Sequence, residues 1–372
     1  MGGTWQERNY QANEPVDAVY LWVDSNDPSF QTDYQSWFDA RQEPDAIAAR
    51  RFRDNEELRY SLRSLELHAP WINHVFIVTN GNAPLWINTN NPQISVVSHR
   101  QIFPDPTVLP VFNSYSIELN LHRIPGLSRK FLYLNDDFFL GRDVNRDNYF
   151  QADESQLFYF EPNPIFEPTN VSPVHDRADA YTGVIIDKHS KVKRTRKSEA
   201  AYSMRRSFKM LPLPLRQLLP AHRLLPGHIP QIYDCEILSY LERLFPEEFA
   251  ITRAHRFRAA DDLVIRILYA FFLLECEPEM LSLEPVVLNW ESPDYHFIPM
   301  QGTLETVKAI FSRCATLNPR FICVNDDLGD APADDPILTV LRGFLQAKYP
   351  LPSSFENLNG FDTDAFAARI EK

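Results

Sequence analysis

The chain has 372 residues, a formal net charge of −13, 44% hydrophobic residues and 23% charged residues. A chain of this length can bury one large core or two modest ones, and its composition is close to the average for globular proteins. The negative charge argues against sequence-independent nucleic-acid binding, which depends on many cations that neutralise phosphates. Nucleotide substrates are not excluded, because a divalent cation screens a pyrophosphate from carboxylates.

The sequence also bears on the cellular compartment. The four cysteines contain no C-x-x-C pair and stand beside no histidines at zinc-like spacing: they are Cys235, Cys276, Cys314 and Cys323. We therefore expect reduced thiols and a cytoplasmic location. The N-terminus is polar and predicts no signal peptide, and the longest apolar stretch, residues 263–274, is too short to span a bilayer. Peripheral association with a membrane assembly and homo-oligomerisation are both left open.

Predicted strands and helices alternate after residues 1–15, which we expect to form a disordered tail. Apolar runs predict four strands, at residues 16–24, 74–79, 94–97 and 130–134. Helical patterns lie between them, at residues 54–69 and 114–123. This alternation indicates an α/β fold with a mostly parallel sheet and helices on both faces. Ligands of such sheets lie outside the carboxyl ends of the strands.

The first predicted helix carries a start signal and an apolar face. Asp54 is its expected N-cap and Glu57 closes a capping box. Leu58, Leu62 and Leu65 recur at helical spacing, and Ala69-Pro70 ends the pattern.

The pattern weakens between about residues 151 and 225, where prolines accumulate, and we expect an inserted, lid-like region there. This region holds a basic run: Lys188, Lys191, Lys193, Arg194, Arg196 and Lys197. The run is either a solvated loop or a docking patch for a polyanionic acceptor or a membrane surface. Later elements are predicted as helices at 234–245, 261–274 and 335–349 and a strand at 320–324. Residues 16–350 are thus expected to form a single domain, and residues 351–372 a C-terminal tail.

An Asn-Asp-Asp triplet occurs twice, each time behind an apolar strand. The copies are Asn135-Asp136-Asp137 and Asn325-Asp326-Asp327. Magnesium is typically held by one or two carboxylates together with substrate phosphates. A single triplet is equally typical of an acidic turn stabilised by its own backbone, but the repetition favours a metal site.

A histidine and two arginines complete the candidate residues. His228 lies in the rigid segment Pro226-Gly227-His228-Ile229-Pro230 and suits a general acid or base, although an ordinary loop histidine is also consistent. Arg256 and Arg258 suit a phosphate clamp or a local ion pair with Asp261-Asp262. These residues indicate metal-assisted phosphate chemistry, but they do not separate a sugar transferase from a phosphatase.

Four segments resemble, in order, the signatures of the Stealth family of hexose-1-phosphate transferases, which act in microbial capsule synthesis. The family includes the animal N-acetylglucosamine-1-phosphotransferase. The first segment is residues 17–28. The second runs from Arg51-Phe52-Arg53-Asp54-Asn55-Glu56-Glu57 through Asn80-Gly81 and Ile117-Glu118 to Asp137. The third comprises Gly227-His228, residues 245–249 and His255-Arg256-Phe257-Arg258, and the fourth is residues 321–327.

The resemblance implies a Rossmann-like, GT-A-type nucleotide-sugar-binding fold and transfer of sugar-1-phosphate to a glycan hydroxyl. It implies these catalytic residues: Asp136, Asp137, His228, Arg258 and Arg177. Mg²⁺ (or Mn²⁺) is expected at Asp136, Asp137 and Asp326. Substrate contacts are expected from Tyr20, Trp22, Asp24, Asp27, Arg53, Asn55, Glu56, Arg59, Asn80, Gly81, Glu118 and Asn135.

The expected donor is UDP-N-acetylglucosamine, with release of UMP and retention of the anomeric configuration. Either His228 or Asp137 would accept the proton of the acceptor hydroxyl. Two alternatives are kept. One is a metal-dependent glycosyltransferase that releases UDP, and the other is a non-catalytic protein of polysaccharide assembly.

Overall fold

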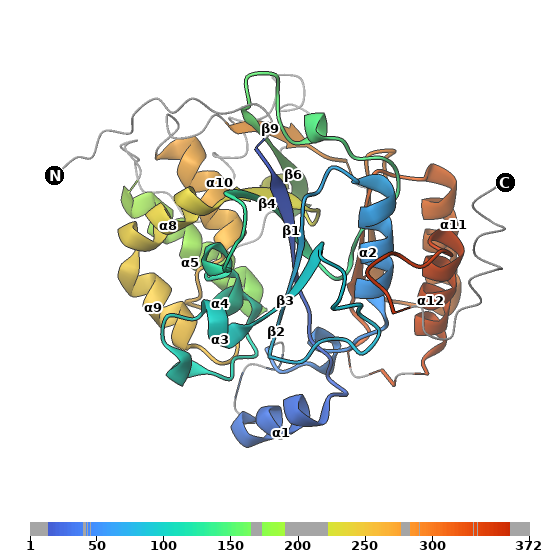
Figure 1. Cartoon of the computed structure of the whole chain (residues 1–372), viewed down its shortest axis with the longest axis horizontal. Helices are drawn as coiled ribbons and strands as arrows, with labels where there is room; N and C mark the ends of the chain where they lie inside the picture. The colour runs from blue at the N-terminus through green and yellow to red at the C-terminus, as the bar shows by residue number, and fades with distance from the viewer. Residues whose placement is uncertain are drawn as a thin grey trace.

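The computed structural model describes residues 14–39, 42, 44, 46–164, 173–189, 222–276, 283–289, 291–329, 331–332 and 334–357. Its main sheet has the strand order β3-β2-β1-β4-β8 (Figure 1). These strands are β1 (Val16–Leu21), β2 (Val75–Thr79), β3 (Ile94–Ser98), β4 (Lys130–Asn135) and β8 (Gln231–Asp234). The first four in chain order are parallel, and β8 is antiparallel to β4. The predicted α/β fold with a mostly parallel sheet is confirmed.

Helices cover both faces of this sheet (Figure 1). One face packs against α3 (His99–Ile102), α4 (Ser114–Glu118), α5 (Val174–His189), α8 (Cys235–Leu244), α9 (Pro246–Ala254) and α10 (Ile265–Glu275). The other face packs against α2 (Glu57–His68), whose Leu58, Leu62 and Leu65 are buried as predicted. Because both faces are covered, β1 and β4 are apolar along nearly their whole length.

A second sheet continues directly from the first. It has the order β10-β11-β5, formed by β10 (Tyr295–Met300), β11 (Phe321–Asp326) and β5 (Phe138–Leu140). β11 is parallel to β10 and antiparallel to β5. Helix α2 contacts β5, and α11 (Leu304–Leu317) and α12 (Pro336–Lys348) pack together beside it, with α12 also in contact with α2 (Figure 1, right). Asp136-Asp137 is the link between β4 and β5, so it lies where the two sheets meet.

A third sheet contains the described parts of residues 151–225. β6 (Gln156–Pro164) pairs with β7 (His222–Pro226) and with β9 (Leu283–Val287). Phe158 and Phe160 of β6, together with Ala178 and Ile185 of α5, are buried in the same core as α10. These described parts are therefore integral to the domain, and a lid role for the region stays a prediction. Apart from Lys188 at the end of α5, the basic run at 191–197 lies outside the described residues.

Two predicted helix boundaries were wrong for identifiable reasons. The predicted capping box is absent: α2 begins at Glu57, and the Glu57 carboxylate accepts from the backbone N and Nδ2 of Asn55 at 2.5 and 2.8 Å. The helix predicted at 114–123 ends at Glu118. Nδ2 of Asn120 donates to the carbonyl oxygen of Ser116 at 2.9 Å and takes the place of the backbone donor that would continue the helix. A 3₁₀ turn, Leu121–Arg123, follows. Side chains of this type compete with the helical backbone for its own hydrogen bonds.

Residues 351–357, which the sequence places in a tail, pack against the domain. Glu356 is 5% exposed and bridges Arg63 of α2, with Oε1 and Oε2 at 2.7 and 2.8 Å from the guanidinium. The four cysteines are free thiols, and all except Cys235 are buried. Within the described ranges, no helix combines the length and the apolar character needed to cross a membrane.

Candidate active site

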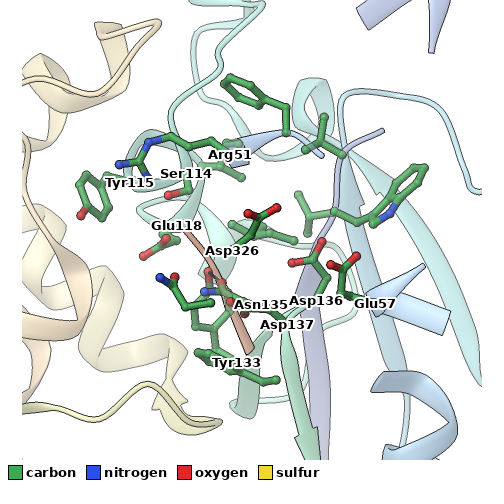
Figure 2. Close-up of a pocket in the computed structure, with 18 of the residues that line it drawn as sticks. Arg51, Glu57, Ser114, Tyr115, Glu118, Tyr133, Asn135, Asp136, Asp137 and Asp326 are labelled. Carbon is green, nitrogen blue, oxygen red and sulfur yellow. Dashed lines mark hydrogen bonds between the residues drawn. The ribbon is translucent and has the colours of Figure 1, made fainter. Parts of the chain in front are cut away.

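A cavity of about 590 Å³ opens at the carboxyl ends of β1, β2 and β4 (Figure 2). Trp22 and Asn80 line it just beyond β1 and β2, and Asn135 is the last residue of β4. The loop before β8 adds His228, and the loop after α9 adds Arg258. This is the edge of the sheet at which ligands of α/β folds bind.

Ten of the residues predicted for the site line this cavity: Trp22, Arg53, Asn80, Glu118, Asn135, Asp136, Asp137, His228, Arg258 and Asp326. The other predicted residues are not among the lining residues: Tyr20, Asp24, Asp27, Asn55, Glu56, Arg59, Gly81 and Arg177.

Several of these eight residues make structural contacts that explain their placement. The buried Tyr20 hydroxyl lies 3.0 Å from Ser61 Oγ, on the α2 side of the sheet. Asp27 is the N-cap of α1 (Pro28–Trp37) and accepts from the Phe30 amide at 2.8 Å. Arg59 pairs with Glu56 at 2.6 Å and lies 5.0 Å over the Trp86 ring. Asn55 holds the carboxylate of Glu57, as described above.

The two Asn-Asp-Asp triplets meet in the tertiary structure. β5 and β11 pair antiparallel with Phe138 opposite Cys323. The amide of Val324 donates to the carbonyl oxygen of Asp137 at 3.0 Å, so the ladder extends to the last residue of the first triplet and to the residue directly before the second. In Figure 2, Asp326 therefore lies close to Asp136 and Asp137, although nearly two hundred residues separate them in the chain.

Burial and mutual repulsion raise the pKa values of the carboxylates at this junction. The pKa of Asp136 is raised well above its usual value by burial, then by Asp137 and Asp54. Burial, with Glu57 and Asp326, raises the pKa of Asp137 to about 7. Burial and Asp136 raise the pKa of Glu57 to about 8. Like charges this close in a medium of low dielectric constant disfavour ionisation, and a bound cation would reverse this.

Glu57 is a cavity residue that sequence reasoning missed, because its position fits a capping box equally well. It lies beside Asp136 in Figure 2. Only the packing of the start of α2 against the end of β4 shows that Glu57 lies in the cluster of carboxylates formed with Asp136 and Asp137.

The donor set fits a magnesium ion that is completed by substrate. Among the described residues, no three or more His, Cys, Asp or Glu side chains are arranged to hold a metal by themselves. Asp137 Oδ1 is buried without a hydrogen-bond partner, which leaves it available as a ligand. Magnesium commonly takes one or two carboxylates and fills its remaining positions with water and phosphate oxygens. Asp136 and Asp137 meet that requirement.

Asp326 is the member of the predicted metal set that fits least well. Its Oδ2 accepts from Arg53 Nη1 at 2.7 Å, and its Oδ1 accepts from the Leu328 amide at 3.0 Å. Arg53 also donates to the carbonyl oxygens of Gly329 and Ala331 at 2.9 and 2.8 Å. Both carboxylate oxygens of Asp326 are thus engaged, and the arrangement ties the end of β11 to the residues before α2.

His228 and Arg258 occupy other walls of the cavity. His228 Nδ1 lies 2.6 Å from Oε1 of Glu161, a residue of β6 that sequence reasoning missed. Arg258 donates from Nη2 to Ser114 Oγ at 2.8 Å, and its guanidinium lies 4.5 Å over the ring of Tyr115. Stacking and hydrogen bonding together fix the plane of the guanidinium.

The loop that carries Arg258 is held by Asp262. This fully buried carboxylate accepts from Asn113 Nδ2 at 2.9 Å and from the Ala259 amide at 2.8 Å, and it pairs with His255 Nδ1 at 2.8 Å. The local ion pair was predicted for the two arginines, but it is His255 that pairs with Asp262, and Arg256 donates to the carbonyl oxygen of Pro110 at 3.1 Å. Arg258 contacts Ser114 and Tyr115 in the cavity wall.

Comparisons with known proteins bear on the family of this chain. The chain matches three family models: Stealth protein CR2, conserved region 2, at residues 51–158, Stealth protein CR3, conserved region 3, at 227–275, and Stealth protein CR4, conserved region 4, at 316–366. Asp136 and Asp137 fall in the first match, His228 and Arg258 in the second, and Asp326 in the third.

Two bacterial relatives match over most of the chain. Exopolysaccharide phosphotransferase SCO6023 of Streptomyces coelicolor is 33% identical over 92% of this chain and 52% of its own length. Capsular polysaccharide phosphotransferase SacB of Neisseria meningitidis serogroup A is 30% identical over 92% of this chain and 57% of its own length. The chain thus spans about half the length of these curated relatives.

Among solved structures, galactosyltransferase LgtC in complex with donor and acceptor sugar analogues is similar over 93% of this chain and 99% of its own. The identity is 10% and the TM-score 0.38, and no conclusion rests on that likeness. The three conserved regions follow one another in order across the described domain. The chain belongs to the Stealth family.

Proposed function

We propose that this protein transfers a hexose-1-phosphate from a nucleotide-sugar to a hydroxyl group of a glycan. The observation that carries the proposal is the convergence of Asp136-Asp137, His228 and Arg258, from three separate segments, on one cavity. Phosphoryl transfer needs carboxylates that hold a metal ion, a positively charged side chain that contacts phosphate oxygens, and a group such as imidazole that accepts a proton. The printed names of the bacterial relatives, which are phosphotransferases of exopolysaccharide and capsular polysaccharide, support the same class.

Each group has a role in this proposal. Arg258, whose plane is fixed by Tyr115 and Ser114, neutralises charge that develops on the transferring phosphoryl group. His228 or Asp137 accepts the proton of the attacking hydroxyl. Mg²⁺ or Mn²⁺, held by Asp136 and Asp137, would neutralise the diphosphate of the donor. The ends of β1 and β2, at Trp22 and Asn80, would contact the nucleotide.

The reaction would be a displacement at the phosphorus atom that carries the sugar. The acceptor oxygen bonds to phosphorus, the bond to the nucleoside monophosphate breaks, and the anomeric C–O bond stays intact. The anomeric configuration of the sugar is therefore retained. We propose UDP-N-acetylglucosamine as the donor, with UMP as the leaving product. A cytoplasmic location, peripheral attachment to a membrane assembly and homo-oligomerisation stay predictions.

The identity of the released nucleotide tests the proposal. Purified protein is incubated with UDP-N-acetylglucosamine, Mg²⁺ and a pool of oligosaccharide acceptors, with and without a chelator. UMP that disappears with the chelator supports sugar-1-phosphate transfer, whereas UDP would identify a metal-dependent glycosyltransferase. Tight donor binding without either product, across a panel of nucleotide-sugars, would favour a non-catalytic role in polysaccharide assembly. The Asp137→Asn variant serves as the inactive control.

A further inference from the structure

Glu161 is a buried carboxylate that the proposed chemistry does not yet use. It lies on β6, between β7 and β9, and its side chain is only 2% exposed. A carboxylate removed from water in this way is costly unless its oxygens are paired. The hydrogen-bond partners of Glu161 therefore indicate its role in the site.

Three donors converge on Glu161. His228 Nδ1 lies 2.6 Å from Oε1, and the backbone amide of His228 donates to Oε2 at 3.4 Å. The hydroxyl of Tyr295, on β10, donates to Oε2 at 2.8 Å. Burial alone would raise the pKa of Glu161, but His228 and Tyr295 outweigh it and lower the pKa below its usual value. Glu161 is thus held as a carboxylate directed at His228.

The loop that carries His228 is also fixed relative to Glu161. The Gly227 amide donates to the carbonyl oxygen of Tyr159 at 2.9 Å, which extends the β6–β7 pairing by one step. The ring of Phe297 lies 5.7 Å from the imidazole on another side. The imidazole itself remains 39% exposed and lines the cavity. With Nδ1 directed at Glu161, Nε2 is the ring nitrogen left for a substrate.

We infer that Glu161 is a positioning residue that selects the Nδ1-protonated tautomer of His228 and so makes Nε2 the base for the acceptor hydroxyl. This inference rests on the proposed function and decides between its two candidate bases in favour of His228. A neutral imidazole has one donor and one acceptor nitrogen, and the partner of the first decides which nitrogen can accept. In the transfer step the proton of the hydroxyl goes to Nε2, and the resulting imidazolium is stabilised by the Glu161 carboxylate.

Other titratable and charged groups lie near Glu161 and His228 and influence how this pair responds to pH. Burial alone would lower the pKa of Arg266, on α10, but Asp179 first and then other neighbours that include Glu161 raise it above its usual value. Its guanidinium donates to Asp179 and to the carbonyl oxygen of Pro226. Tyr295 from β10 and Cys323 from β11 are the titratable neighbours on the remaining sides, and the pKa values of both are raised by burial first and then by negative charge.

The test is Glu161→Gln, which keeps the size of the side chain and removes its charge. In ¹⁵N-histidine-labelled protein without substrate, with His228→Gln used to assign the signal, we expect wild-type His228 to be Nδ1-protonated when neutral. In Glu161→Gln the Nδ1-protonated form should lose population to the Nε2-protonated form, because an amide can also donate to Nδ1 whereas a carboxylate only accepts. Because this readout needs no substrate, it is decided independently of the proposed function.

Kinetics supply the second readout. We expect kcat of Glu161→Gln to fall at least about tenfold, KM for the donor to stay near the wild-type value, and the acid limb of the rate profile to move to lower pH. Tyr295→Phe, which removes one donor to Glu161 but no charge, should change kcat far less. Unchanged tautomer populations of His228 and an unchanged acid limb in a folded Glu161→Gln variant would overturn the inference. If wild-type protein released UDP, or no nucleotide, the proposed function would fail even where the tautomer measurement supported the Glu161–His228 coupling.

Discussion

The amide nitrogen of Val324 lies 3.0 Å from the carbonyl oxygen of Asp137, and this hydrogen bond extends the β5–β11 ladder to the end of the first Asn-Asp-Asp triplet and to the residue directly before the second. The pairing places Asp326 near Asp136 and Asp137 at the meeting point of two sheets. It also concentrates like charges in a buried place, and the raised pKa values there show the electrostatic cost. The four predictions that follow test the consequences.

The two triplets should respond differently to substitution. In wild-type protein, Mg²⁺ together with UDP-N-acetylglucosamine should raise the melting temperature, because ligands that bind only the folded state stabilise it. Asp137→Asn should lose this response to Mg²⁺, and its kcat should fall about 100-fold or more. Asp326→Asn should keep the response to Mg²⁺, since Arg53 and the Leu328 amide already engage its carboxylate. Thermal shift assays with and without the cation would contradict this assignment if both variants lost the response equally.

The carboxylate cluster should make the metal-free protein less stable as the pH rises. The folded-state pKa of Glu57 is about 8, above its usual 4.5, so the folded state binds more protons than the unfolded state between these values. The free energy of unfolding therefore falls with pH across this window. Glu57→Gln should be more stable than wild type at pH 8, and the difference should shrink toward pH 5 in urea denaturation. Glu305→Gln, at an exposed position of α11, is the control and should show no such trend.

Arg258 and Arg177 should differ strongly in catalysis. Arg258 lines the cavity, whereas Arg177, on α5, is not among the lining residues. Arg258→Ala should lower kcat/KM by about 100-fold or more. Arg258→Lys should recover little of it, because lysine cannot reproduce the planar contact with Tyr115. Arg177→Ala should cost much less in steady-state kinetics. A loss for Arg177→Ala equal to that for Arg258→Ala would restore Arg177 to the catalytic set.

The segment after α12 should be needed for stability. The side chains of Arg63 and its bidentate partner Glu356 are 8% and 4% exposed, so removal of the Glu356 carboxylate leaves a buried guanidinium without this charged partner. Glu356→Gln should cost about 3–5 kcal/mol of unfolding free energy, as expected for a broken buried pair. Glu66→Gln is the matched control. Glu66 lies on α2, the helix that carries Arg63, and accepts from the Ser354 amide at an exposed position. Chemical denaturation of the two variants should therefore give clearly different midpoints.

The sequence predicted the framework of the fold well, because the signals involved are local. The apolar runs at β1, β2, β3 and β4 and the leucine face of α2 can each be recognised from neighbouring residues alone. Tertiary packing confirmed them without changing their type. The errors lay at boundaries such as the start of α2 and the end of α4, where side-chain hydrogen bonds compete with helix signals.

The candidate site was predicted only in part. Asp136, Asp137, His228 and Arg258 were candidates from their local sequence context and were given catalytic roles by motif resemblance, and the structure brings all four to one cavity. Glu57 was interpreted as part of a capping box, and Glu161 carried no recognisable signal. A single glutamate before a helix, or within a proline-rich strand, looks the same in sequence whether it is exposed or buried beside the site.

The sequence by itself thus determined the α/β class, the order of the first four strands along the chain and most of the chemical groups at the sheet edge. Only the tertiary structure decided that Asp326 is engaged by Arg53, that Glu57 joins the carboxylates and that Glu161 faces His228. Local propensity and hydrophobic period act over a few residues. The protonation state and direction of a buried polar group depend instead on partners that folding brings from distant segments.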